Sequence, residues 1–109
     1  MQIVSCEENC AKVKLAVRPH LLNGAQIVHG GVLFSPADYA FALAANAGQD
    51  SGLAINASIS FIKAARIDDE LFAEARLISR SRRLGTYQVT VPDNKGVVLA
   101  LVQSTAYFK

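Results

Sequence analysis

One carboxylate stands inside an almost wholly apolar stretch of this sequence. The stretch runs from His29 to Asn46, and Asp38 is its only acidic residue. Apolar residues recur there every three or four positions and also fill the remaining faces, which predicts a helix buried nearly all round. Asp38 is then expected in or beside the core. Burying an ionised carboxylate without partners is costly, so a carboxylate in such a place is usually kept for chemistry.

Two glycines, Gly30 and Gly31, stand at the amino end of the same predicted helix. They leave backbone N–H groups unhindered where the helix dipole is positive, which favours an anion or a polarised carbonyl oxygen that water can attack. Asp38 lies about two turns along, roughly 11 Å away, too far to act on the same substrate atom from one chain. Either the two features are unrelated, or a second copy of the helix brings its own Asp38 to this amino end.

The motifs around this stretch form a pattern that resembles the hot-dog fold acyl-CoA thioesterases of the phenylacetate-pathway (PaaI) type. The pattern comprises Asn23-Gly24, Val28-His29-Gly30-Gly31, Phe34, Ala37-Asp38, Ala40-Phe41, Ala44 and Asn46. It continues through residues 59–65, 72–75 and 80–83 to Asp93 before Gly96, so it covers nearly the whole chain. As a spacing pattern, the Asn, His-Gly-Gly and Asp set is far more specific than a lone glycine motif.

The resemblance implies catalytic roles for four residues. The Gly30 N–H acts as an oxyanion donor, Asp38 as general base or nucleophile, Asn23 assists at the carbonyl or the water, and His29 supports the site. Each has a structural alternative: a capping role for Asp38 with Ser35 and Pro36, a tight start of the helix for Gly30, a turn for Asn23, and a loop hydrogen bond for His29. Gly31 is expected beside the substrate, chiefly as a conformational glycine.

Substrate binding is predicted at cationic and small polar residues. Acyl-CoA carries phosphates that Arg and Lys side chains grip, and the strand ends at 63–66 and 80–83 are expected to converge on one mouth. Some relatives carry a serine or threonine that holds the attacking water where Ala54 stands, and Asn56 or Ser58 on the same strand face is a substitute. The alternative for the cations is a solvated cluster of charges, and the alternative for Asn56 and Ser58 is a polar face toward solvent or toward another dimer. The predicted substrate-binding residues are Gly31, Asn56, Ser58, Lys63, Arg66, Arg82 and Arg83.

Composition indicates one domain over residues 1–109, at 51% hydrophobic residues and a net charge of +2. This charge leaves no global field for nucleic acid or a membrane, and no long uncharged apolar run or basic leader marks a span or a signal peptide, so we expect a cytoplasmic protein. Cys6 and Cys10 are expected to be free thiols near a mobile terminus. No metal and no cofactor beyond the coenzyme A of the substrate are predicted.

Alternating patterns predict strands over 12–17, 53–63, 70–79, 84–91 and 97–108, with a hairpin turn at 92–96 and with Gly48 or Asn46 as a left-handed helix cap. The resulting fold class is α+β, a hot-dog fold with a five-stranded antiparallel sheet wrapped round one long helix. The strand over 53–63 lacks protection as an edge, and the resemblance implies that it pairs with its copy in a homodimer. Small residues at 54, 58 and 60 permit a dimer of dimers.

These expectations combine into an acyl-CoA thioesterase with its site at the dimer interface. Phe34, Tyr39, Phe41 and Phe61 favour an aryl or a short to medium apolar acyl group over a charged one. A non-catalytic hot-dog protein that binds acyl-CoA or a small ligand is the alternative from another class. A hot-dog dehydratase is a third, and no Asp/His pairing supports it.

Overall fold

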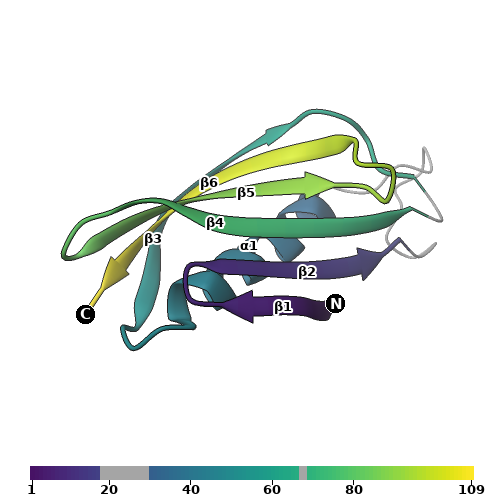
Figure 1. Cartoon of the computed structure of the whole chain (residues 1–109). Coiled ribbons are helices and arrows are strands. Elements are labelled where there is room, and N and C mark those ends of the chain that lie inside the picture. Colours follow the sequence, from purple (N-terminus) through teal and green to yellow (C-terminus); the bar gives the residue numbers. More distant parts are fainter. Residues whose placement is uncertain (18–29, 67–68) are drawn as a thin grey trace.

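A computed structural model describes residues 1–17, 30–66 and 69–109. It contains one helix, α1 (Gly30–Asn46), and six strands that form one antiparallel sheet in the order β1-β2-β4-β5-β6-β3 (Figure 1). The strands are β1 (Gln2–Glu7), β2 (Cys10–Ala16), β3 (Gly52–Phe61), β4 (Glu70–Arg80), β5 (Leu84–Pro92) and β6 (Val98–Phe108). No helix in these ranges is long and apolar enough to cross a membrane.

The helix packs along one face of the sheet, and the hydrophobic core lies between the two. Three alanines of α1, at positions 37, 40 and 44, are fully buried, and their small side chains let the helix lie close to the strands. On the sheet side, alternate residues of β5, including Tyr87 and Val89, are buried as the two-residue repeat of a half-covered strand requires. The α+β class and the hot-dog arrangement predicted from sequence are confirmed.

The sheet has six strands where the sequence predicted five. The first residues form β1, which pairs with β2 through a hairpin whose Asn9 adopts a left-handed φ of 66°. The expectation of a mobile terminus around the cysteines was therefore wrong, although both thiols are free. Cys6 stands opposite buried Ala11 and Cys10 opposite Arg76, so the two lie on opposite faces of the hairpin and cannot join without rearranging it.

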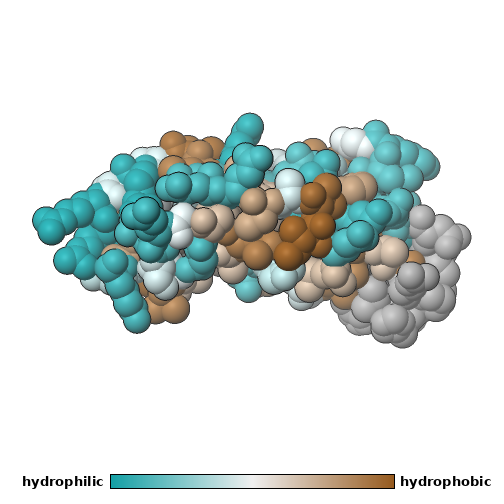
Figure 2. All heavy atoms as spheres, turned by 60° about the horizontal axis from the view of Figure 1, so that its bottom comes forward, coloured by the Kyte–Doolittle hydropathy of each residue, from teal (hydrophilic) through white to brown (hydrophobic). Residues whose placement is uncertain are grey.

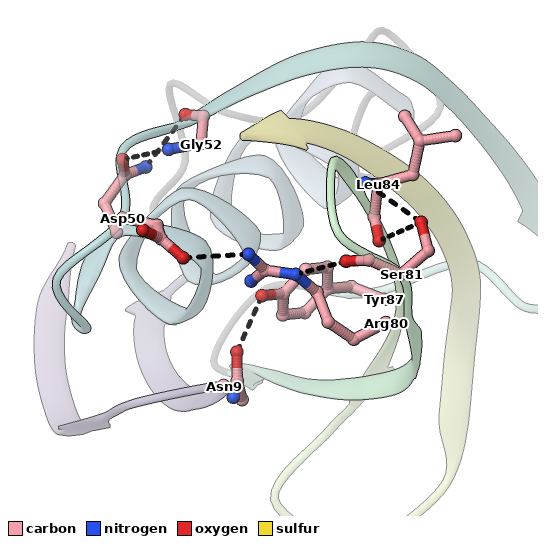
Figure 3. A network of polar contacts seen from close by, with 8 residues as sticks. Asn9, Asp50, Gly52, Arg80, Ser81, Leu84 and Tyr87 are labelled. Atoms are coloured by element: carbon pink, nitrogen blue, oxygen red, sulfur yellow. Dashed lines mark hydrogen bonds and ion pairs between the residues drawn. The ribbon is translucent and has the colours of Figure 1, made fainter. Parts of the chain in front are cut away.

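Asn9 ties the hairpin to three other elements. Its N–H donates to the Ala44 carbonyl of α1 at 3.0 Å, and its own carbonyl accepts from the Leu77 N–H of β4 at 3.0 Å. Its side-chain oxygen accepts from the Tyr87 hydroxyl at 2.8 Å (Figure 3). Burial raises the pKa of Tyr87, Arg80 partly offsets this and Glu8 adds to it, so the hydroxyl stays protonated and donates. An asparagine suits this position because it tolerates φ above zero.

The carboxyl end of α1 is capped by the side chain of Asn46 and not by a residue in the left-handed conformation. The Asn46 amide donates to the carbonyls of Ala42 at 2.9 Å and Gly52 at 3.2 Å, and its oxygen accepts from the Gly52 N–H at 2.8 Å. Among the described residues only Asn9 and Gly96 have positive φ, so the left-handed cap predicted at Asn46 or Gly48 was wrong. The hairpin turn predicted at 92–96 is confirmed, with Gly96 at φ 84°.

Candidate active site

The amino end of α1 lies against the carboxyl end of β3. The helix begins at Gly30, and a Cβ added there would stand 2.9 Å from two ring carbons of Phe61. Gly30 therefore lets the Phe61 ring lie against the helix amino end, and a larger side chain at this position would push the exposed ring aside. At Gly31 an added Cβ would meet nothing within 4 Å, and its φ is not positive. The conformational role predicted for Gly31 was wrong, since neither space nor backbone geometry in the subunit demands a glycine there.

Asp38 is exposed in the subunit, which corrects the prediction of a helix buried nearly all round. A single sheet can bury only the side of the helix that faces it, so the other side of α1 stays exposed. This exposed stripe consists of polar and small residues. Its exposed members are Gly31, Ser35, Asp38, Tyr39, Ala42 and Asn46. Figure 2 brings the side of the molecule that is lowest in Figure 1 forward and shows hydrophobic side chains in its middle with hydrophilic ones toward both ends.

The capping alternative for Asp38 was wrong. A capping box would start the helix near Ser35, but the helix begins at Gly30, and the Ser35 hydroxyl donates to the Gly31 carbonyl at 2.8 Å. Pro36 lies inside the helix and has no N–H to continue the bonding ladder at that point. Asp38 therefore stands in the middle of a formed helix, where no helix start needs its carboxylate.

The helix and β3 run antiparallel beside one another, so Asp38 has a definite place along the edge of the sheet. Gly30 meets Phe61 at one end, and Asn46 binds Gly52 at the other. Successive helical residues turn by about 100°, which puts Asp38 between the directions of Phe34 and Ser35 and toward the β3 side of the exposed stripe. Asp38 thus lies about 12 Å from Gly30 along the helix axis. Asn23 and His29, also predicted for the site, lie outside the described residues.

A bulge in β3 changes which residues share a face. The pairing with β6 shifts between Ala54 and Asn56, and Ile55 is the extra residue. Before the bulge Ala54 stands opposite buried Ala106, and after it Asn56 stands opposite Thr105, on the outer face. The prediction that Asn56 and Ser58 share the strand face of Ala54 was wrong, because the added residue inverts the alternation. Both side chains point to the outer surface of the sheet.

The predicted cations do not converge within one subunit. Lys63 and Arg66 follow β3 and lie at the end of the sheet where α1 begins, whereas Arg82 and Arg83 lie in the β4–β5 hairpin at the other end. The molecule is 45 Å long, so the two groups are too far apart to grip one cofactor from the same chain. The sequence showed the charges but not the direction of each strand end.

The aromatic residues predicted for the acyl pocket separate into two kinds. Phe41 is buried at 2% exposure and packs edge-on against Tyr87 with ring centroids 5.3 Å apart, so it belongs to the core. Phe61 reaches Gly30, and Phe34 lies one turn along the helix and is half-buried. These two rings border the helix amino end. Tyr39 is exposed and lies on the side of the helix away from β3.

A second polar cluster was not predicted as a unit. At the far end of the sheet, the Arg80 guanidinium binds Asp50 at 2.9 Å and donates to the Ser81 carbonyl (Figure 3). It also stacks 3.5 Å from the Phe108 ring centroid. A cavity of about 330 Å³ opens beside it, lined by Asp50, Arg82, Arg83, Phe108 and Lys109. The basic residues between Arg80 and Arg83 indicated a charge cluster in the sequence. The sequence did not indicate that Asp50, from the segment between α1 and β3, joins this cluster, because that contact depends on tertiary structure.

Comparisons with known proteins agree with this architecture. Residues 25–100 match the model of a family described as the thioesterase superfamily. The chain is 39% identical over 106 residues to a protein of Archaeoglobus fulgidus, covering 97% of this chain and 69% of that protein. It is 32% identical over 107 residues to the acyl-coenzyme A thioesterase PaaI of Escherichia coli, covering 98% and 76% respectively. The solved structure of E. coli PaaI, from the phenylacetic acid degradation operon, superposes with a TM-score of 0.95 at 31% identity, covering 99% of this chain and 78% of that one.

Proposed function

Because the chain belongs to the thioesterase superfamily, we propose that it hydrolyses acyl-CoA thioesters at sites shared by two subunits. The observation that carries the shared site is the separation of its two parts. Gly30 lies at the amino end of α1, and Asp38 is exposed two turns along the same helix, beside the edge strand β3. One chain cannot bring both to one carbonyl, but a second chain docked on that edge supplies the missing partner.

In the proposed reaction the Gly30 N–H and the helix dipole polarise the thioester carbonyl, with Asn23 assisting and His29 supporting the site. The partner subunit's Asp38 takes a proton from water, the resulting hydroxide attacks the carbonyl carbon, and the tetrahedral intermediate releases the coenzyme A thiolate and the carboxylic acid. Attack by Asp38 itself, through an anhydride that water then opens, is the other route that the same geometry permits. Neither route uses a metal ion or an organic cofactor.

The dimer proposed for this site forms through β3. This strand lies at the edge of the sheet, and its exposed apolar side chains are large for a surface strand: Leu53, Ile55 and Phe61 are each more than half exposed, as is Ile62 beyond it. A bare edge of this kind presents unpaired N–H and C=O groups that a second copy can satisfy. Antiparallel pairing of two β3 strands around a two-fold axis extends the sheet across both subunits.

The shared site also determines the register of that pairing. Asp38 lies about 12 Å from Gly30 along the helix. Gly30 lies beside Phe61, so a two-fold axis halfway along this separation crosses β3 about 6 Å from Phe61. Rotation about that axis brings the partner subunit's Asp38 to the same position along the strand as Gly30. A distance of about 6 Å corresponds to roughly two strand residues. We therefore expect the axis close to Ile59.

This register predicts a pattern of disulfide cross-linking. In a background with Cys6→Ala and Cys10→Ala, oxidation should link Ile59→Cys chains into covalent dimers, while Leu53→Cys, about 40 Å from its copy in this arrangement, should stay unlinked. The measurement is non-reducing electrophoresis after mild oxidation, with sedimentation to give the mass in solution. A folded 11.7 kDa species would contradict the dimer, and links at Leu53→Cys but not at Ile59→Cys would contradict the register. A mass of four chains would indicate the dimer of dimers.

A panel of acyl-CoA substrates tests the proposed function itself. Phe34 and Phe61 border the helix amino end, so aryl and short to medium apolar acyl groups should be hydrolysed faster than charged ones such as succinyl. The measurement is release of free coenzyme A thiol, with matched acyl groups of each kind. Binding of acyl-CoA without turnover of any member would replace the proposed hydrolase with a ligand-binding hot-dog protein.

A further inference from the structure

The helix α1 consists of two segments that the sheet holds to different extents. We call residues 30–35 its amino segment and residues 36–46 its anchored segment. Leu33 is the only buried residue of the amino segment, whereas six residues of the anchored segment are buried. The two glycines at the start weaken the amino segment further, since glycine loses more conformational freedom in a helix than any other residue. The proposed oxyanion donor Gly30 thus lies on the loosely held segment, and Asp38 lies on the anchored one.

Pro36 stands at the junction of the two segments. Its nitrogen carries no hydrogen, so the Val32 carbonyl lacks the bond that a helix normally supplies from four residues on. The Ser35 hydroxyl donates to the Gly31 carbonyl at 2.8 Å, and such a bond back onto the preceding turn weakens and bends helices. The hydrogen-bond ladder is therefore interrupted where the segments meet. The Pro36 ring itself is fully buried, which fixes the junction on the core.

The position of Pro36 around the helix sets the direction in which the amino segment bends. A proline ring clashes with the carbonyl four residues before it, so the helix opens on the side of the ring and its amino end tilts to the opposite side. Successive residues turn by about 100°, so Asp38 lies about 200° round from Pro36, on the side of β3. A bend at Pro36 therefore carries Gly30 toward β3, where a Cβ added to Gly30 would stand 2.9 Å from the Phe61 ring.

From the uneven burial, the interrupted ladder and the direction of the bend we propose that Pro36 is a hinge on which the amino segment closes over the thioester. In the shared site the Gly30 N–H moves with the amino segment of one chain, and the partner subunit's Asp38 stays on its own anchored segment. Pro36 is thus a positioning residue, which acts through Gly30 and does not touch the substrate. This inference rests on the proposed function and adds how the oxyanion donor reaches the carbonyl.

Pro36→Ala tests the hinge through kinetics. It restores the N–H and removes the ring, so the helix should straighten and Gly30 should draw back from β3. Because the Gly30 N–H bond is strongest on the oxyanion, its loss affects the transition state more than the bound substrate. We expect kcat for an acyl-CoA to fall at least about tenfold, with KM within about twofold of the wild type, measured by thiol release. Pro36→Gly restores the N–H but keeps a pliable backbone, so it should recover part of the loss.

Val89→Ala is the matched control for packing. Val89 is fully buried in β5, so its truncation removes carbon atoms from the core between helix and sheet and leaves the helix backbone unchanged. It should lower the thermal midpoint and keep kcat. A wild-type kcat in Pro36→Ala, an equal loss of kcat in Val89→Ala, or no recovery in Pro36→Gly would each overturn the hinge.

Amide hydrogen exchange measures the hinge without turnover. The amides of Phe34 and Ser35 bond within the amino segment, and their exchange should slow at least about tenfold in Pro36→Ala relative to the amides of residues 40–45. In the wild type, a hexanoyl-CoA analogue with a methylene in place of the thioester sulfur keeps the carbonyl and should slow the same amides. The thioether analogue lacks the carbonyl and should leave them unchanged. Equal slowing by both analogues would overturn closure on the carbonyl.

The two readouts separate the hinge from the proposed function. If the protein hydrolyses no acyl-CoA, yet the ketone analogue alone slows exchange in the amino segment, the proposed function fails and the hinge stands. If hydrolysis is normal and exchange in the amino segment is the same in the wild type and in Pro36→Ala, the hinge fails and the function stands.

Discussion

Asp38→Asn is expected to lower kcat/KM for acyl-CoA by at least about a hundredfold, which corresponds to about 2.7 kcal/mol of transition-state stabilisation. The substitution keeps the shape of the side chain and removes the group that takes a proton from water. Because Asp38 is exposed in the middle of α1, the fold of the subunit does not depend on its charge. The thermal midpoint should therefore stay within a few degrees of the wild type.

The matched control for this variant is Asp50→Asn, which also neutralises one carboxylate but lies at the far end of the sheet in an ion pair with Arg80. It should lose a little stability and keep kcat. Activity is measured by thiol release and stability by thermal unfolding on the same samples. Wild-type turnover in Asp38→Asn together with a lower thermal midpoint would show that the carboxylate is structural and that the proposed mechanism is wrong.

The second large effect is recovery of activity in mixed dimers of two inactive chains. Gly30→Val puts a branched side chain where even an added Cβ would stand 2.9 Å from two carbons of the Phe61 ring, so it displaces that ring and crowds the helix amino end that offers the N–H. Asp38→Ala removes the base. Each homodimer should be inactive. A mixed dimer has one site with both lesions and one with neither, so about half of the wild-type activity per dimer should return.

A reciprocal pairing makes this experiment decisive. A chain that carries both Gly30→Val and Asp38→Ala, paired with a wild-type chain, should be inactive, because every shared site then contains one lesion. Both mixtures are co-refolded, and native mass spectrometry establishes the fraction of mixed dimer. If the first mixture is inactive and the second keeps half of the activity, Gly30 and Asp38 act from the same chain, and the shared site has to be abandoned.

The local elements of this fold follow from patterns of short range. The helix over 30–46 and the strands from 70 to 108 are found close to their predicted bounds, because apolar periodicity and turn residues such as Asp93 and Gly96 act over a few positions. The strand formed by residues 2–7 was missed, since all of its residues are exposed and it has no buried alternation to reveal it.

For the candidate site, too, some features were predictable from the sequence and others depended on the tertiary structure. Residue types and spacing by themselves pointed to the family to which the chain belongs, to Gly30 and Asp38 as candidate site residues, and to the separation between them that led us to propose a second subunit. Only the tertiary structure decided that Asp38 is exposed, that the bulge at Ile55 turns Asn56 away from Ala54, and that Lys63 and Arg83 lie at opposite ends of the sheet. The physical reason is that burial, strand face and strand direction depend on contacts between residues far apart in the chain. A helical pattern specifies which side chains lie on the same side of the helix. Whether that side is buried depends on which other elements pack against it in the folded protein.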